Sequence, residues 1–168
     1  MSYYLRKPTT KDETMILDYL HEWGEEKMVP GSMRLFEMSY QEWLLFTMNQ
    51  EKSETCKEGN VPASFYLFME NNEIIGAVHI RHILNDYLLF VGGHIGYGIR
   101  PSQRGKGKAK EMLKLACVAA RALGIEDILV TADDDNPASY KTIESCGGIK
   151  ENEVLDQGHY VYRYWIKK

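Results

Sequence analysis

Two spacings of apolar residues alternate along the chain and predict its elements. Between residues 10 and 50, apolar side chains recur every three or four positions, which is the period of an amphipathic helix. Capping-box patterns occur at Thr10–Glu13 and Ser39–Glu42, and Pro30–Gly31 interrupts the region. We therefore expect two helices there, preceded by a weakly alternating strand at residues 3–7.

In the next part of the chain the apolar period changes to two. Residues 64–70 and 73–84 alternate on either side of Asn71–Asn72, which predicts a β-hairpin with the two asparagines at its tip. Residues 94–100 are expected to form a third strand of the same group. The polar residues 51–63, which contain glycine and proline, are expected to form a surface loop before the hairpin.

The clearest helix is predicted over residues 104–123, where apolar residues mark one face and a glycine follows. The short, nearly all-apolar run at 126–132 is typical of a strand that is buried on both faces. Asn136–Pro137 is expected to open a further helix that ends at Gly147–Gly148. An aromatic strand is expected at the end of the chain, over residues 160–168.

The resulting order of elements is β-α-α-β-β-β-α-β-α-β-β. This order predicts a mixed α/β (α+β) fold in which helices flank a mixed sheet. No repeat or linker divides the sequence, and 168 residues suit one domain, residues 1–168. The composition, with 44% hydrophobic and 26% charged residues, is that of a globular protein.

Charge and cysteine content narrow the function classes. The formal net charge is −4, so nucleic acid is not expected as the main partner. The three cysteines are far apart and form no C-x-x-C pair, which suits free thiols in a reducing compartment. No apolar run is long enough for a secretory leader or a membrane span. We therefore expect a cytoplasmic protein with no membrane partner.

Residues 96–116, GYGIRPSQRGKGKAKEMLKLA, join a glycine-rich strand to a basic loop and a helix start. Gly105 and Gly107 lack Cβ atoms, so a ligand can approach the backbone, and the first-turn N–H groups of the helix have no intrahelical partner. Such a segment suits a bound polyanion. A solvated helix face explains the charges equally well. The five cations are Arg104, Lys106, Lys108, Lys110 and Lys114.

The motif in this segment is neither of two common phosphate loops. A Walker loop would need glycine at Arg100, and a dinucleotide fingerprint would need glycine at Lys110. The pattern that fits is R-x-x-G-x-A at residues 104–109, between a strand and an amphipathic helix. With the segment DNPASYKTIESCGG at 135–148, it resembles the GNAT superfamily of acyl-CoA-dependent N-acyltransferases. The resemblance is strongest from His94 to Gly148.

The resemblance implies a three-layer α/β/α fold whose mostly antiparallel sheet is splayed at its central strands, and acetyl-CoA as co-substrate. The amides of residues 104–109 would hold the pyrophosphate, and the strand ending at Ile99–Arg100 would pair with the pantetheine arm. A backbone N–H near Gly96–Ile99 would polarise the thioester carbonyl. The implied cofactor-binding residues are Gly98, Ile99, Arg100, Arg104, Gly105, Lys106, Gly107, Lys108, Ala109, Asn136 and Ser139.

Some of these residues also suit structural roles. Gly96 and Gly98 fit either a β-bulge, at which the family splays this strand, or a close approach of another backbone segment. Asn136 is expected to cap the helix that follows it, which is compatible with a cofactor contact.

Two residues are candidates for proton transfer. An attacking amine must be deprotonated, and His94 stands where the family often has a carboxylate base. A histidine bonded to backbone or solvent is the alternative. The family's usual acid, a tyrosine seven residues after the asparagine, is replaced by Ile143. Tyr140 lies one helical turn earlier and is the candidate acid, with a packed or surface tyrosine as the alternative.

The resulting hypothesis is an N-acetyltransferase that moves the acetyl group of acetyl-CoA to a primary amine by direct transfer in a ternary complex. Cys117, on a buried helix face, and Cys146, near a helix end, are not expected to carry the acyl group. The alternative is a GNAT-like sensor or scaffold that binds acyl-CoA without turnover, which Ile143 favours.

Other ligands are predicted only weakly. We expect no metal site, because the acidic run at residues 133–135 fits a solvated turn before a helix. Residues 1–60 contain more acidic than basic side chains, which weakly favours a cationic amine as acceptor. A solvated acidic face explains this excess equally well. Monomer and homodimer both remain open.

Overall fold

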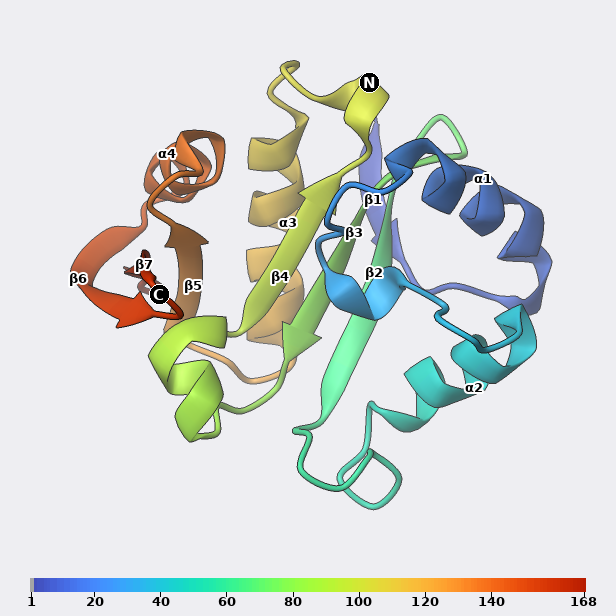
Figure 1. Ribbon diagram of the computed structural model, residues 1–168, viewed down its shortest axis with the longest axis horizontal. Coiled ribbons are helices and arrows are strands. Elements are labelled where there is room, and N and C mark those ends of the chain that lie inside the picture. The colour runs from blue at the N-terminus through green and yellow to red at the C-terminus, as the bar shows by residue number, and fades with distance from the viewer. Residues whose placement is uncertain (1) are drawn as a thin grey trace.

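The computed structural model describes residues 2–168 and has the expected order of elements. Figure 1 shows how they are arranged. The strands are β1 (Tyr3–Arg6), β2 (Ala63–Glu70), β3 (Glu73–Arg81), β4 (Ile95–Ile99), β5 (Ile128–Asp133), β6 (Ile149–Asp156) and β7 (His159–Ile166). The α-helices are α1 (Glu13–Trp23), α2 (Tyr40–Asn49), α3 (Lys108–Ala122) and α4 (Pro137–Ser145). Short helical turns are η1 (Thr10–Asp12), η2 (Gly31–Met33), η3 (Leu88–Gly92) and η4 (Pro101–Gln103).

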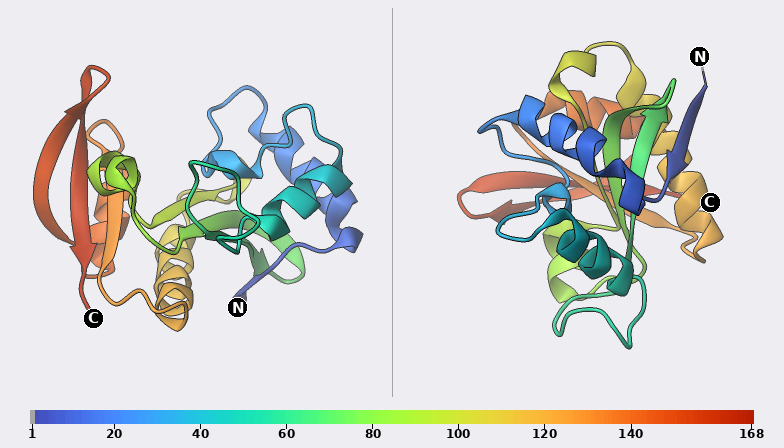
Figure 2. Two further views of the ribbon diagram at one scale, coloured as in Figure 1. Left: turned by 90° about the horizontal axis from the view of Figure 1, so that it is seen from below. Right: turned by 90° about the vertical axis from the view of Figure 1, so that its right-hand side faces the viewer.

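The strands form two antiparallel sheets instead of one continuous sheet. The first has the order β1-β2-β3-β4 and the second β5-β7-β6. β4 and β5 are neighbours that diverge, so the molecule opens between them (Figures 1 and 2). The predicted splay of the central strands is therefore present.

Helices cover both faces of the first sheet. On one face, α3 packs with β3 and β4, and α4 packs beside it with β5 and β7 of the second sheet; their shared cluster includes Met112, Leu113 and Ile143. On the other face, α1 and α2 pack with β2 and β3 in a second cluster that includes Tyr19 and Trp43. This arrangement is the expected α/β/α layering, and the burial of its apolar faces is the main stabilising contribution.

Local sequence signals agree with most boundaries. Asn71 and Asn72 have positive φ angles of 50° and 63° at the β2–β3 turn, as the hairpin prediction requires. Ser39 and Glu42 form the expected capping box. Asn136 caps α4 by accepting a hydrogen bond from the Ser139 N–H.

Two boundaries differ from the prediction. The first capping box is formed by Thr9 and Asp12 instead of Thr10 and Glu13, because a 3-10 turn precedes α1. The helix expected from residue 104 begins at Lys108. The residues before it form η4 and a glycine loop, in which Gly105 and Gly107 take φ angles of 73° and 74°.

Candidate active site

The opening between β4 and β5, which we call the split, is closed by backbone contacts only where the two strands begin. We call this point, formed by His94 and Leu129, the vertex. The N–H of His94 donates to the Leu129 carbonyl at 2.8 Å, and the N–H of Leu129 donates to His94 Nδ1 at 2.9 Å. Gly93 permits this approach, because a Cβ on it would lie 2.7 Å from the Leu129 carbonyl oxygen. Beyond this point no ladder joins the two strands, so β4 and β5 diverge towards their C-terminal ends.

The hydrogen bond at the vertex indicates which nitrogen of the His94 ring carries the proton. Its side chain is buried, at 7% exposure, and burial lowers its pKa to about 4. In the neutral ring one nitrogen is a donor and the other an acceptor. Because Nδ1 accepts from Leu129, the lone pair that a general base would use is already occupied.

The edge of β4 that faces the split carries free backbone donors. On the other edge, Arg81 N–H donates to the His94 carbonyl and Arg100 N–H donates to the Ile75 carbonyl. Donors alternate along an antiparallel strand, so the N–H groups of Tyr97 and Ile99 point away from β3, towards the split. The β3–β4 register has no shift, and β4 therefore has no bulge.

Of the two glycines of β4, Gly98 serves a close approach instead of a bulge. A Cβ on Gly98 would overlap the Val29 carbonyl oxygen, and one on Gly96 would lie 3.5 Å from Pro30 Cβ. The α1–α2 connection thus rests directly on β4. The expected close approach is confirmed for Gly98, whereas Gly96 has room for a Cβ.

The loop before α3 presents unpaired amides. Gly107 is the N-cap of α3 and provides no side-chain cap, and side chains built on Gly105 or Gly107 would meet open space. Among the described residues, the N–H groups of residues 105–110 have no hydrogen-bond partner. A row of free N–H groups at the positive end of a helix dipole is suited to bind phosphate.

The cations near this loop point away from it. Arg100 pairs with Asp18 and Glu22 of α1, and Arg104 pairs with Glu26 at 2.7 Å. The Arg104 guanidinium also lies over the Trp23 ring, 4.8 Å from its centroid. These arginines therefore hold the β4–α3 connection against α1.

Lys108 is also turned inward. Its side chain is 9% exposed and pairs with Glu70 at the end of β2. It also donates to Gln103 Oε1 at 2.6 Å. Lys106 donates to the Ser102 carbonyl at 3.2 Å. In this structure the cations of the motif stabilise the loop, and its backbone provides the free donors.

Helix α4 faces β4 through Ser139. The Tyr97 hydroxyl lies 3.2 Å from Ser139 Oγ, which connects the two sides of the split. Burial raises the pKa of Tyr97 to about 12, so its hydroxyl stays protonated. The sequence analysis missed Tyr97 because the spacing of residues within β4 does not show which helix its hydroxyl reaches.

Tyr140 and Ile143 differ in their surroundings. The Tyr140 ring packs on Tyr162 of β7, with centroids 5.4 Å apart. Ile143, at the position of the usual family tyrosine, is fully buried in the core and contacts Gly148. Tyr140 therefore packs against Tyr162, which agrees with the alternative to a catalytic acid, a packed tyrosine.

Cys117 and Cys146 are poor nucleophiles. Burial raises the pKa of Cys117 to about 11 and also raises the pKa of Cys146. Since a thiolate is the reactive form, neither thiol is activated. Within residues 2–168, no cluster of three or more His, Cys, Asp or Glu side chains is arranged to hold a metal ion. No helix of this part of the chain is long and apolar enough to cross a membrane.

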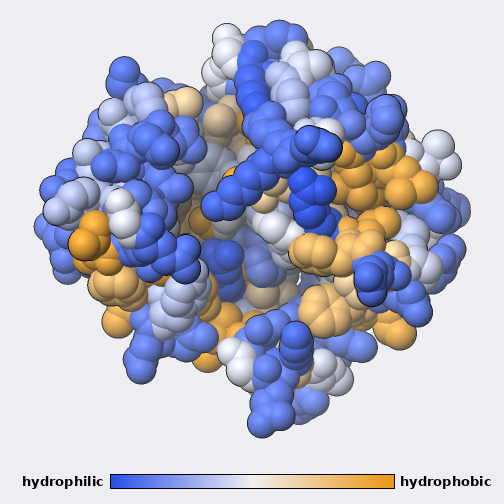
Figure 3. Space-filling view, viewed as in Figure 1, coloured by the Kyte–Doolittle hydropathy of each residue, from blue (hydrophilic) through white to orange (hydrophobic). Residues whose placement is uncertain are grey.

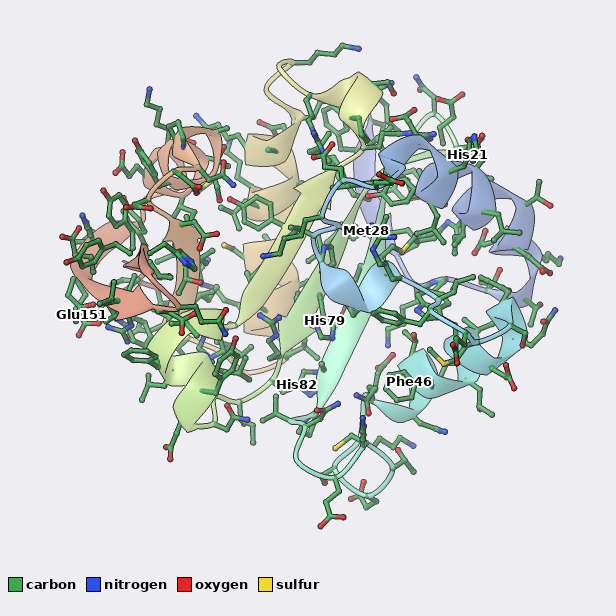
Figure 4. The ribbon with its side chains drawn as sticks, viewed as in Figure 1. His21, Met28, Phe46, His79, His82 and Glu151 are labelled. Atoms are coloured by element: carbon green, nitrogen blue, oxygen red, sulfur yellow. The ribbon has the colours of Figure 1, made fainter. Side chains whose placement is uncertain are left out.

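The surface is hollowed beside the split. Figure 3 shows this hollow, with hydrophilic residues on its floor, between the β5–β7 lobe and the lobe of α1 and α2. An open pocket of about 490 Å³ between α1 and η4 is lined by the Arg100 ion pairs. A smaller pocket of about 140 Å³ is bordered by Phe46 of α2 and His79 of β3, both labelled in Figure 4.

Comparison with known proteins identifies the family. A family model described as "Acetyltransferase (GNAT) domain" matches residues 3–149. The chain therefore belongs to the GNAT acetyltransferase family. No curated protein sequence matches this chain significantly.

Solved GNAT structures share the fold at low sequence identity. A Streptococcus pneumoniae GNAT-family acetyltransferase is 17% identical, with 98% of each chain covered and a TM-score of 0.68. The ribosomal-protein-S5-alanine acetyltransferase of Vibrio fischeri is 18% identical, with coverage of 98% and 92% and a TM-score of 0.72. A Salmonella typhimurium protein solved with its cofactor acetyl-CoA is 14% identical, with coverage of 99% and 94% and a TM-score of 0.66.

Proposed function

We propose that this protein transfers the acetyl group of acetyl-CoA directly to a primary amine in a ternary complex. Membership of the GNAT family supports acetyl transfer. The observation that supports the cofactor most strongly is the row of unpaired amides at residues 105–110, next to the open edge of β4. These amides would hold the pyrophosphate, and the free edge of β4 would pair with the pantetheine arm.

When bound, acetyl-CoA would supply an acetyl group activated as a thioester. A C–N bond to the amine would form and the C–S bond would break, so that CoA leaves as a thiolate and the amine releases one proton. The protein contributes the N–H groups of Tyr97 and Ile99, which face the split and would stabilise negative charge on the carbonyl oxygen. Direct transfer fits the raised pKa of the Cys117 and Cys146 thiols.

For the leaving thiolate we propose a hydrogen bond from a tyrosine hydroxyl. Tyr97 is the first candidate, because its protonated hydroxyl lies between β4 and Ser139 of α4. Tyr140 remains the second candidate. The comparison of Tyr97→Phe with Tyr140→Phe separates them: we expect kcat to fall roughly tenfold or more in Tyr97→Phe and to change little in Tyr140→Phe.

For the amine proton we propose transfer to water in the open hollow. His94 was the candidate base, but its Nδ1 lone pair is occupied by the Leu129 N–H, so we give His94 the structural role that was its alternative. The measurement is the pH dependence of kcat/KM. We expect it to follow the pKa of the acceptor amine, so that changing the amine shifts the profile.

The test of the whole proposal uses two measurements on the intact protein. Calorimetry with acetyl-CoA measures binding, and release of free CoA in the presence of an amine panel measures transfer. We expect both binding and acceptor-dependent CoA release. Binding without transfer to any amine would support the alternative, a sensor or scaffold, which the core position of Ile143 favours. Absence of binding would contradict both.

A further inference from the structure

Arg81 lies at the end of β3, beside the strand that we propose presents the acetyl group. Side chains alternate along a strand, so Arg81 shares a face with His79 and Ala77, the face covered by α1 and α2. Its Nη2 and Nη1 atoms lie 3.6 Å and 3.9 Å from the position that a Cβ on Gly96 would take. The guanidinium therefore lies next to Gly96, near the start of β4.

Only one side of the Arg81 guanidinium is used. Its Nη1 donates to the carbonyls of Gly92 and Gly93, at 3.0 Å and 3.2 Å. A guanidinium has five N–H donors in a planar fork. Among residues 2–168, neither Nη2 nor Nε has a partner. The free pair is the edge that binds a carboxylate with two parallel hydrogen bonds.

No carboxylate of the described chain balances this charge. The contrast is Arg163, which is buried but pairs with Glu151 and donates to Asn152 at 2.8 Å. Arg81 forms no ion pair among the described residues. Burial lowers the pKa of Arg81, and Tyr87 is the group that opposes this shift. A partly buried, unpaired cation is costly, and an anionic ligand would remove that cost.

The neighbouring titratable groups do not supply a counter-charge. The pKa of His79 falls to about 3, through burial first and Arg81 second, and the pKa of His94 is lowered by the same two causes. His82, further along, shares a hydrogen bond with Ser64 Oγ at 2.8 Å. This corner of the molecule therefore holds one fixed positive charge among neutral rings.

We propose that the acceptor amine carries a carboxylate, and that this carboxylate binds the free Nε–Nη2 edge of Arg81. The inference rests on the proposed function, because it names the substrate class for the same transfer site. Arg81 is adjacent to Gly96, so the carboxylate and the reacting amine lie close together on the substrate. The class that fits is a small amino acid-like molecule.

This inference replaces the weak prediction from the sequence that the acceptor is a cationic amine. The acidic balance of residues 1–60 suggested it, and two of these carboxylates, Asp18 and Glu22, are held by the same arginine, Arg100. Glu22 also accepts hydrogen bonds from the N–H and hydroxyl of Ser102 at 2.9 Å. These carboxylates hold α1 to η4 and do not form a cation site at the β4–β5 split.

The experiment compares matched acceptors on the wild-type protein. Each common amino acid is offered with acetyl-CoA next to its carboxamide and next to the amine that lacks the carboxylate, and CoA release is followed. We expect at least one acid to exceed both of its partners in kcat/KM by roughly 30-fold or more. Carboxamides, simple amines or polyamines that match or exceed every acid would overturn the inference.

Variants of Arg81 test the residue itself. With the best acid, Arg81→Met should raise KM roughly 30-fold or more and remove the preference for the acid over its carboxamide. Arg81→Lys should restore part of it, since a lysine keeps the charge without the fork. The control is Arg121→Gln, which loses a charge on α3 where Arg121 donates to the Lys167 carbonyl. An unchanged acid preference in folded Arg81→Met would overturn the inference.

The design separates this inference from the proposed function. Calorimetry with acetyl-CoA reports the cofactor site alone, and Arg81→Met should bind it as wild type does. If acetyl-CoA binds and amines without a carboxylate are acetylated best, the inference fails and the function stands. If wild type binds no acetyl-CoA, the proposed function fails. The acceptor comparison needs only wild-type protein, so a variant that fails to fold does not remove the test.

Discussion

The two ends of β4 differ in how their backbone groups are satisfied. At the start of the strand, His94 and Leu129 exchange two hydrogen bonds, and Gly93 lets the strands touch. At the far end, the chain turns through η4 into a glycine loop whose amides, from Gly105 to Lys110, have no partner among the described residues. One end is closed by the protein itself, and the other leaves free the donors that we propose bind the cofactor.

At the open end, the basic side chains of the motif are mostly engaged in ion pairs, and the free donors are backbone N–H groups. Arg100 pairs with α1, Arg104 with Glu26 just after α1, and Lys108 with β2, and these ion pairs fix the position of the loop. Loop position matters more than loop charge, because backbone N–H groups bind a phosphate only when they point at the same place. The side chains thus orient the loop, and the backbone is left to bind.

The largest expected effect is on the open end. The double variant Gly105→Val/Gly107→Val places branched residues at φ angles of 73° and 74° and should weaken acetyl-CoA binding roughly 1000-fold, because the strained loop loses several charge-assisted hydrogen bonds. Calorimetry measures the affinity.

The matched control for this double variant is Gly124→Val/Gly158→Val. Both glycines have positive φ, 93° and 85°, and open space around the added Cβ, so the backbone strain is similar. We expect a loss of thermal stability and an unchanged affinity. An equal loss of affinity in both double variants would show that strain, and not the loop amides, controls binding.

The second effect separates stability from binding at Lys108. Lys108→Met leaves Glu70 buried without its partner and should lower the free energy of unfolding by roughly 3 kcal/mol, while acetyl-CoA affinity changes less than about threefold. Chemical denaturation and calorimetry measure the two quantities. A large loss of affinity in the folded variant would mean that the lysine itself binds phosphate.

The same ion pair predicts an acid dependence of stability. The hydrogen bond from Lys108 lowers the pKa of Glu70 below 4.5. A carboxylate whose folded pKa is lowered stabilises the fold above its unfolded pKa and loses that contribution as pH falls through the folded pKa. Wild type should therefore lose stability relative to Lys108→Met as the pH is lowered below about 4.5.

The third effect tests the closed end. His94→Ala leaves the Leu129 N–H without an acceptor and should cost roughly 2 kcal/mol of unfolding free energy. His94→Asn places an oxygen near the Nδ1 position and should recover most of it. Denaturation of both variants gives the stability, and their acetyl transfer is measured alongside. Loss of transfer in a stable, cofactor-binding His94→Asn would make His94 the base after all.

The smallest effect compares the two glycines of β4. Gly98→Ala would push a methyl group into the Val29 carbonyl, whereas Gly96→Ala would meet Pro30 at an ordinary 3.5 Å. We expect the first substitution to lower stability by roughly 1–2 kcal/mol more than the second. Thermal unfolding gives the difference, and equal stability would mean that the α1–α2 connection does not rest on β4.

Features that depend on local chemistry were predictable from the sequence. The period of the apolar residues in α3, the asparagine turn between β2 and β3, and the cap at Asn136 each follow from neighbouring residues. The glycine loop before α3 was predictable for the same reason, since its conformation depends on Gly105 and Gly107 themselves. The family resemblance added the splay between β4 and β5.

Features that depend on distant partners were not predictable. The direction of Arg104 depends on Glu26 and Trp23, which are about 80 residues away in the sequence. The occupied lone pair of His94 depends on Leu129, and the free edge of Arg81 depends on the path of residues 92–93. A sequence shows that a residue can act as a base or a phosphate ligand, but the fold determines which of its atoms remain available.

The central claim is that the open end of β4 and the start of α3 bind acetyl-CoA through backbone amides. The most direct measurement is a two-dimensional ¹H–¹⁵N spectrum of the labelled protein during titration with CoA. We predict large shifts for the amides of residues 105–110, Tyr97 and Ile99, and small ones for His94 and Leu129. Saturating CoA that leaves the amides of residues 105–110 unmoved would contradict it.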